Sequence, residues 1–219
     1  MSDLTLVIGN KNYSSWSLRP WLLLRQANVP FSEVLIPLYT PESRKELTKY
    51  SPSGLVPVLI DGPVVVWDSL AICEYLAEKF PDRSLWPAGA EARAMARSVS
   101  AEMHSGFAAL RSNMPMNCRE RFPGKGMNEA VRYDIDRITD IWKSCRARFG
   151  TNGAMLFGKF SVADAMFAPV ALRFLTYGVA LDGVAQSYVA AILSLPAVQE
   201  WIADAGKERQ RIEQFELYQ

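Results

Sequence analysis

Residues 56–69, VPVLIDGPVVVWDS, contain two short apolar runs separated by a turn. The runs Val56–Ile60 and Val64–Trp67 flank Asp61-Gly62, a dipeptide typical of tight β-hairpins. The second run leads directly into Ser69–Phe80, where apolar residues recur at helical spacing. This stretch predicts an antiparallel strand pair followed at once by a helix.

The residues before this stretch predict two further strands, each followed by a helix. Leu4–Ile8 and Phe31–Leu38 have the composition and alternation of strands. Trp16–Asn28 carries apolar residues at helical spacing, and Pro41–Tyr50 is a polar segment that we expect to form a short exposed helix. The resulting order, β-α-β-α-β-β-α, predicts a compact mixed sheet with helices packed against it.

The composition changes at Pro81–Gly89, which is rich in proline and glycine and predicts a linker. Beyond it the chain is periodic and predicts helices at Ala90–Arg111, Met127–Phe149, Phe160–Tyr177, Val184–Leu193 and Ala197–Gly206. We therefore expect an α/β domain over residues 1–80, a linker over 81–89, and an all-α helical bundle over 90–219.

The composition excludes several kinds of chemistry. The 219 residues carry 24 Lys plus Arg against 23 Asp plus Glu, without the basic excess typical of nucleic-acid binders. No apolar run is long enough for a membrane span, and residues 1–3 lack the pattern of a signal peptide. We therefore expect a soluble cytoplasmic protein that binds neither nucleic acid nor membranes.

The scarcity of histidine and cysteine narrows the possible chemistry further. A single histidine, His104, excludes a multi-histidine metal site, and Cys73, Cys118 and Cys145 include no C-x-x-C pair. We expect no bound metal, and Cys73 in particular to be a buried small hydrophobic residue. Three thiols without a disulfide framework suit a reducing compartment.

Polar residues stand at the strand-to-helix junctions. Ser14–Pro20, SSWSLRP, follows the first strand, and Asp68-Ser69 follows the hairpin. Serine and aspartate at such positions cap helices, and a helix N-terminus can also bind an anion. Val56-Pro57 fits a proline at a strand start, or a cis proline that presents the backbone to an extended peptide. Ser161 and Asp164 have the spacing of a structural capping box.

Taken together, these motifs resemble the cytosolic glutathione transferases, over essentially the whole chain and nearest to the serine-type zeta and tau classes and their bacterial relatives. The resemblance implies a thioredoxin-like N-terminal domain in which Ser14 hydrogen-bonds the glutathione sulfur. It implies that Val56 pairs with the cysteinyl unit before cis Pro57, and that Asp68 and Ser69 hold the γ-glutamyl end. It also implies a homodimer that detoxifies small electrophiles with glutathione as co-substrate, and a folding role for Ser161 and Asp164.

The chain departs from this family at two places. The family often has Lys, Gln or His just before Val-Pro, where this chain has Gly54-Leu55, so we assign the glycyl end of glutathione to Lys45. Zeta isomerases carry an arginine where this chain has Thr176, with Arg173 one turn earlier. For the second-substrate pocket we predict Asn10, Tyr13, His104, Phe107, Arg111 and Tyr177.

Three functions remain open at this point. The first is a transferase in which Ser14 stabilises the glutathione thiolate for attack on a small, largely apolar electrophile. The second is glutathione-dependent cis-trans isomerisation of a dicarboxylate similar to maleylacetoacetate. The third is a transferase-like protein that binds ligands without catalysis.

Overall fold

The computed structural model describes residues 4–218 and begins with a four-stranded mixed sheet of strand order β2-β1-β3-β4. Strand β1 (Leu4–Ile8) runs parallel to β2 (Ser32–Leu35) and antiparallel to β3 (Val58–Asp61), which pairs with β4 (Val64–Trp67). The predicted order and the hairpin are confirmed. Strand β2 is shorter than predicted and ends just before Ile36-Pro37, since proline lacks the N–H that would continue the ladder.

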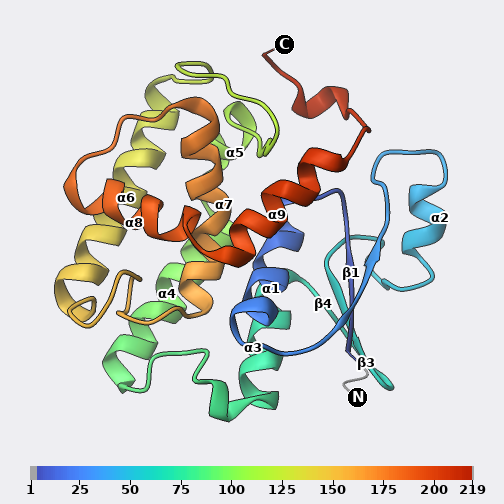
Figure 1. Cartoon of the computed structure of the whole chain (residues 1–219), viewed down its shortest axis with the longest axis horizontal. Helices are drawn as coiled ribbons and strands as arrows, with labels where there is room; N and C mark the ends of the chain where they lie inside the picture. The colour runs from blue at the N-terminus through green and yellow to red at the C-terminus, as the bar shows by residue number, and fades with distance from the viewer. Residues whose placement is uncertain (1–3, 219) are drawn as a thin grey trace.

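Helices cover both faces of this sheet (Figure 1). Helices α1 (Ser15–Gln26) and α3 (Ser69–Lys79) pack together on one face, and the short α2 (Ser43–Leu47) lies on the other. Strand alternation divides β1 between these layers. The large core, on the α1 side, takes Leu4, Leu6 and Ile8, and the small core under α2 takes Val7.

The rest of the described chain is helical. A 3-10 turn, η1 (Pro81–Arg83), leads to α4 (Ala90–Ser105), α5 (Ala108–Asn113), α6 (Glu129–Phe149), α7 (Val162–Tyr177), α8 (Gly183–Leu193), α9 (Pro196–Lys207) and the 3-10 turn η2 (Glu213–Phe215). Helix α7 is buried along almost its whole length and packs on both α1 and α4. The predicted fold class, a sheet with helices followed by a helical region, is confirmed, while the domain boundaries stay a prediction.

The prediction of one helix over Ala90–Arg111 is wrong. The chain breaks at Gly106-Phe107, where Phe107 adopts a left-handed φ of 61°. Arg111 stabilises this break, because its guanidinium donates to the carbonyls of Gly106 (2.9 Å), Met103 and His104 (3.2 Å) at the end of α4. These carbonyls have no partner within the helix, so a side chain from the next turn replaces the missing N–H groups.

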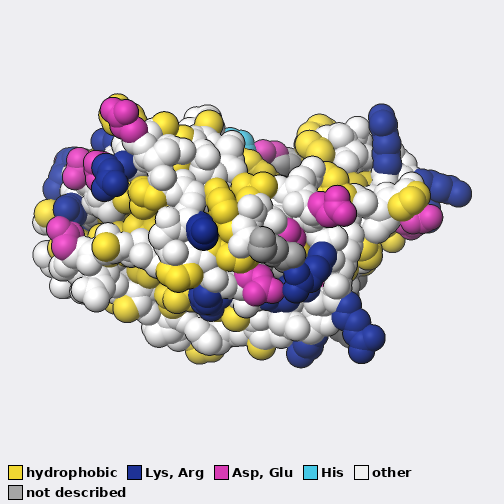
Figure 2. Space-filling view, turned by 90° about the horizontal axis from the view of Figure 1, so that it is seen from above, with side chains coloured by type: hydrophobic (Ala, Val, Ile, Leu, Met, Phe, Trp, Pro, Cys, Tyr) yellow, Lys and Arg dark blue, Asp and Glu magenta, His cyan; other side chains and the backbone are white. Residues whose placement is uncertain are grey.

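After α9 the C-terminal segment runs back across the start of α1 and then toward the α5–α6 loop (Figure 1). From the side that carries the C-terminus, hydrophobic side chains are scattered over the face, and basic side chains project at the end where α2 lies (Figure 2). Between residues 4 and 218, no helix combines the length and apolarity needed to span a membrane.

Candidate functional site

The start of α1 places Ser14 as the N-cap at the end of the β1–α1 loop. Its Oγ accepts a hydrogen bond from the Ser17 N–H at 3.3 Å and donates to Ser17 Oγ at 2.8 Å. Ser17 Oγ in turn accepts from the Gly9 N–H at 3.1 Å. The Ser14 hydroxyl is therefore bonded within the helix start, and it must turn away from Ser17 to donate to a ligand.

The start of α3 presents a carboxylate. Asp68 is the N-cap, and its Oδ1 accepts from the N–H groups of Leu70 (2.8 Å) and Ala71 (3.2 Å). Its Oδ2 lies 3.2 Å from His104 Nε2 on α4, and its side chain remains exposed. The backbone of Asp68 has a φ of 76°, a conformation that side chains other than glycine rarely adopt and that clusters at ligand sites.

Arg19 connects the two helix starts. Its Nη1 lies 3.4 Å from Ser69 Oγ, and the side chain is buried. Its Nε has no hydrogen-bond partner among the described residues. Burial, and after it repulsion from Arg111 and Arg173, lowers the pKa of Arg19 to about 9. A buried guanidinium with an unused donor is unfavourable until an anion reaches it, so this position is suited to a carboxylate.

Two guanidinium groups lie near the Trp16 ring. Arg19 lies 4.3 Å and Arg111 4.7 Å from the centroid of its ring, and His104 meets the ring edge at 5.3 Å. Burial lowers the pKa of His104, although the nearby Asp68 carboxylate opposes the shift. The imidazole is therefore neutral at pH 7. The cluster around Trp16 therefore contains residues from α1, α4 and the first turn of α5.

Helix α7 adds a third guanidinium. Arg173 donates from Nη2 to Ser15 Oγ at 3.2 Å and from Nη1 to the Met114 carbonyl at 2.8 Å. Burial and the charge of Arg111 lower the pKa of Arg173 to about 10. Three mutually repelling guanidiniums beside two serines make this region electropositive, which suits an anionic ligand.

The Val56–Pro57 peptide bond is cis, as predicted. It lies beside the end of β1, because a Cβ built on Gly9 would be 3.2 Å from Val56 Cγ2 and 2.5 Å from Leu38 Cδ1. A side chain at Gly9 would therefore have to displace the Leu38 side chain. The structure brings the Val56 side chain close to Gly9, at the start of the loop that ends at Ser14.

Other residues that we predicted for the site are engaged differently. Lys45 is exposed on α2, and Tyr177 is buried with its hydroxyl donating to the Pro115 carbonyl at 3.0 Å. Phe107 is buried in the large core at the α4–α5 break. Asn10 is bonded to the Leu38 N–H and to Gln210, and the Tyr13 hydroxyl donates to Glu216.

Reasoning from sequence missed two sets of contacts. The bond from Arg173 to Ser15 joins segments that are far apart in the chain, and so do the contacts of Glu208, Gln210 and Glu216 with the β1–α1 loop. Residues 208–218 show neither periodicity nor a motif that would have marked them.

The protein's own thiols are not suited to act as nucleophiles. Burial raises the pKa of Cys118 to about 12 and that of Cys145 to about 11, and it also raises the pKa of Cys73. All three are buried and protonated at neutral pH, as predicted for Cys73. Within residues 4–218 no cluster of three or more His, Cys, Asp or Glu side chains could hold a metal.

The start of α7 is a structural site. Asp164 Oδ2 accepts from the Ser161 N–H at 2.9 Å and from Ser161 Oγ at 3.0 Å, within a capping box. Asp164 Oδ1 accepts from the Leu156 N–H at 3.0 Å and from the Tyr188 hydroxyl at 3.1 Å. Burial raises the pKa of Asp164 to about 6, although these hydrogen bonds favour the ionised form.

Comparison with known proteins identifies the class to which this fold and site belong. Residues 13–79 match the glutathione S-transferase N-terminal domain. The chain is 33% identical over 169 residues to glutathione S-transferase 1 of Dianthus caryophyllus, covering 74% of each chain. It is 35% identical over 128 residues to a probable maleylacetoacetate isomerase of Caenorhabditis elegans, covering 58% of this chain and 59% of that one.

Among solved structures, a glutathione transferase homologue from Burkholderia with bound glutathione has the same fold. It superposes with a TM-score of 0.71 at 22% identity, covering 93% of this chain and 98% of the other. The chain belongs to the cytosolic glutathione S-transferase superfamily. It spans less than two thirds of the length of several curated relatives that it matches, the nematode protein among them.

Proposed function

We propose that this protein is a glutathione transferase in which Ser14 stabilises the thiolate of bound glutathione. One observation carries the proposal: the starts of α1 and α3 meet through the buried Arg19, whose Nε lacks a partner among the described residues. The two helix starts supply a hydroxyl, a carboxylate and a buried cation, a set of groups that would complement a ligand with a thiolate, a carboxylate and an ammonium group.

Glutathione would be held along its backbone. The Val56 main chain before cis Pro57 would pair with the cysteinyl unit, as an added strand does. Ser69, at the N-terminus of α3, would hold the γ-glutamyl carboxylate next to Arg19, and the Asp68 carboxylate would take its ammonium group. Lys45, exposed on α2, is our proposal for the glycyl carboxylate.

The chemistry requires that the glutathione thiol lose its proton near neutral pH. A free cysteine thiol has a pKa of about 8.5, and each unit by which it is lowered requires about 1.4 kcal/mol of thiolate stabilisation. The Ser14 hydroxyl and the N-terminus of α1 supply that stabilisation, aided by the positive potential of Arg19 and Arg111. The proton leaves to solvent, and the sulfur then bonds an electrophilic carbon while the leaving group departs with its electron pair.

The test is the absorbance of the glutathione thiolate, titrated against pH in complexes of the wild type and of Ser14→Ala. We expect Ser14→Ala to raise the thiol pKa by about one unit and to lower turnover at least about tenfold, with little change in glutathione affinity. Ser15→Ala is the matched control, since its hydroxyl accepts from Arg173. A thiol pKa unchanged by Ser14→Ala contradicts the assigned role.

A second function has its own observation. The guanidinium of Arg173 reaches the start of α1 at Ser15, and the similar nematode protein is a probable maleylacetoacetate isomerase. Arg173 would there hold a carboxylate of a small dicarboxylate while the glutathione thiolate catalyses its cis-trans isomerisation. Robust turnover of maleylacetone that Arg173→Met abolishes, with conjugation of neutral electrophiles retained, favours this function over the first.

We also infer a homodimer in the cytoplasm. The homodimer is supported by the exposed apolar side chains Val64, Val65 and Trp67 on β4, which a second copy of the chain would cover. Sedimentation equilibrium tests the homodimer: a Trp67→Lys variant should be monomeric, whereas a monomeric wild type contradicts the inference.

The cytoplasmic location is supported by three free cysteines, which suit a reducing compartment.

A further inference from the structure

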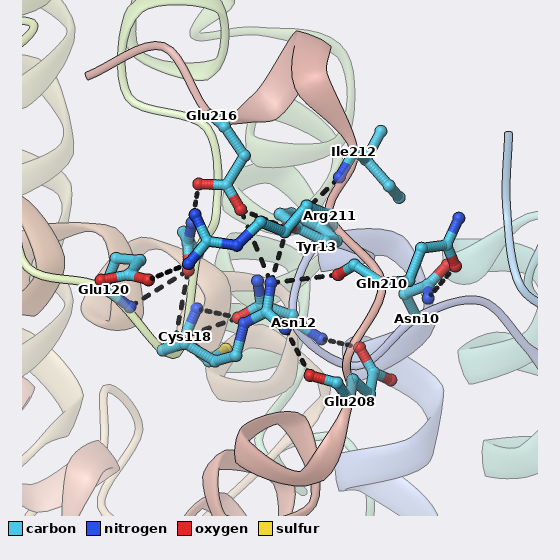
Figure 3. Close-up of polar contacts among 12 residues, drawn as sticks. Asn10, Asn12, Tyr13, Cys118, Glu120, Glu208, Gln210, Arg211, Ile212 and Glu216 are labelled. Atoms are coloured by element: carbon cyan, nitrogen blue, oxygen red, sulfur yellow. Dashed lines mark hydrogen bonds and ion pairs between the residues drawn. The ribbon is translucent and has the colours of Figure 1, made fainter. Parts of the chain in front are cut away.

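The C-terminal segment, residues 208–218, binds each of the four residues that precede Ser14. Figure 3 shows its contacts with Asn10, Asn12 and Tyr13. Gln210 Oε1 accepts from Asn10 Nδ2 at 2.8 Å. The Glu208 carboxylate accepts from the Lys11 N–H at 2.6 Å and from the Asn12 N–H at 3.1 Å. Residues 208–218 therefore hold the loop that carries the proposed thiolate-stabilising group.

Tyr13, the residue next to Ser14, makes the largest number of these contacts. Its hydroxyl donates to Glu216 and accepts from Arg119 Nη2 at 2.7 Å and from the Ile212 N–H at 3.4 Å. Its ring stacks on Phe215, with the centroids 5.7 Å apart. Burial and the bond to Glu216 raise the pKa of Tyr13, so the phenol stays protonated and keeps donating to the carboxylate.

Arg119, in the α5–α6 loop, joins the segment to the helical region. Its guanidinium donates to the carbonyls of Glu208 and of Gln210 (3.1 Å), and it lies 3.5 Å from Glu216. The side chains of Arg119 and Glu216 are only 14% and 5% exposed. A charge pair this well covered, with hydrogen bonds to its remaining atoms, holds a defined geometry that an exposed surface pair does not.

These contacts leave the loop little freedom. Without residues 208–218, the N–H groups of Lys11 and Asn12 and the Tyr13 hydroxyl lose their acceptors at a partly buried site. Ser14 is bonded to the same loop, because its N–H donates to the Asn10 carbonyl at 2.8 Å. Displacement of the loop therefore moves the Ser14 side chain relative to a thiolate, and small displacements of catalytic groups change rates strongly.

We propose that residues 208–218 form a strap that fixes the β1–α1 loop, with Tyr13, Arg119 and Glu216 as positioning residues for Ser14. The inference rests on the proposed function, because it assigns the strap a role in presenting Ser14 to the glutathione thiolate. The described hydrogen bonds of the strap run to residues 10–13, to Leu38 and to the region between α5 and α6, so we expect it to act on thiolate stabilisation rather than on glutathione binding.

The experiment compares Tyr13→Phe and Glu216→Gln with Glu213→Gln, a matched change of an exposed glutamate in the same segment. For the first two variants we expect kcat to fall about tenfold and the bound thiol pKa to rise, with KM for glutathione nearly unchanged. Hydrogen exchange of the amides of residues 11–14 should accelerate in the same two variants. Glu213→Gln should match the wild type in all three measurements.

The outcomes separate the strap from the proposed function. Unchanged amide exchange in Tyr13→Phe and Glu216→Gln overturns the strap, whatever Ser14 does. Faster exchange with an unchanged thiol pKa, when Ser14→Ala does raise that pKa, also overturns it, because the segment is then only structural. If Ser14→Ala leaves the thiol pKa unchanged, the proposed function fails, and the role of the strap in presenting Ser14 fails with it.

Discussion

Helices α7 and α1 both begin with a serine cap, but the polar groups around the two caps are bonded in different ways. At α7, both Asp164 oxygens accept two hydrogen bonds each, all from buried groups. At α1, the Ser14 hydroxyl bonds only to Ser17 among the described residues, and Arg19 retains a donor without a partner there and has a lowered pKa. Capping residues of the same chemical type thus form a closed structural site at α7 and an incomplete, cation-rich one at α1.

Removing the acceptor at α7 should have the largest effect on stability. Asp164→Ala leaves the Leu156 and Ser161 N–H groups and the Tyr188 hydroxyl without partners, so the free energy of unfolding should fall by about 3 kcal/mol. Urea denaturation measures this. Asp182→Ala, at the exposed N-cap of α8 with no side-chain capping bond, is the control and should change stability by less than about 0.5 kcal/mol. Equal effects of the two substitutions would remove the contrast between the caps.

The pH dependence of stability sharpens the same comparison. The folded-state pKa of Asp164 is raised to about 6, so between roughly pH 4 and pH 6 the folded state binds more protons than the unfolded state. This carboxyl therefore makes the protein less stable as pH rises through that window. Between these pH values, the free energy of unfolding of the wild type should fall by about 2 kcal/mol relative to that of Asp164→Asn, whose side chain cannot titrate. Denaturation at several pH values tests this, and a difference between the two proteins that does not vary with pH contradicts it.

A substitution in α1 should have a smaller effect on stability, and one of opposite sign. Arg19→Met removes a buried charge that has no bonded carboxylate, so the free energy of unfolding should rise by about 1 kcal/mol. The same change should weaken glutathione binding about tenfold, because the γ-glutamyl carboxylate loses its cation. Calorimetry and equilibrium binding measure the two effects. The control is Arg25→Met, a change at an exposed position on the same helix, which should alter neither the free energy of unfolding nor the affinity for glutathione. A loss of stability in Arg19→Met would mean that this arginine is structural.

The sequence predicted the parts of the molecule that depend on local pattern. The β1 and β4 runs, the hairpin at Asp61-Gly62 and the helix start at Asp68-Ser69 were predictable because strand alternation, turn chemistry and capping act over a few residues. The first helix was predicted from Trp16, whereas α1 begins at Ser15 with Ser14 as its cap. The break at Phe107 was missed because Arg111 replaces the missing helix bonds with side-chain bonds.

The contacts that join distant segments had no such signal. The spacing of α7 sets which face carries Arg173, but only the packed fold brings that face to Ser15. Likewise, nothing near Tyr13 in the sequence indicates that Glu216 will bind its hydroxyl. The two helix starts of the candidate site could therefore be predicted from the sequence, whereas the positions of the charged residues around them could be known only from the tertiary structure.

The contact between residues 10–13 and residues 208–218 also imposes an order of events on biosynthesis. Residues 208–218 are synthesised after β1, α1 and all the helices up to α9. Since domains generally fold as they emerge, the N-terminal sheet can form early while the loop before Ser14 still lacks its partners. A nascent chain that has not yet reached residue 208 would thus be folded in its sheet before the loop that precedes Ser14 has its partners.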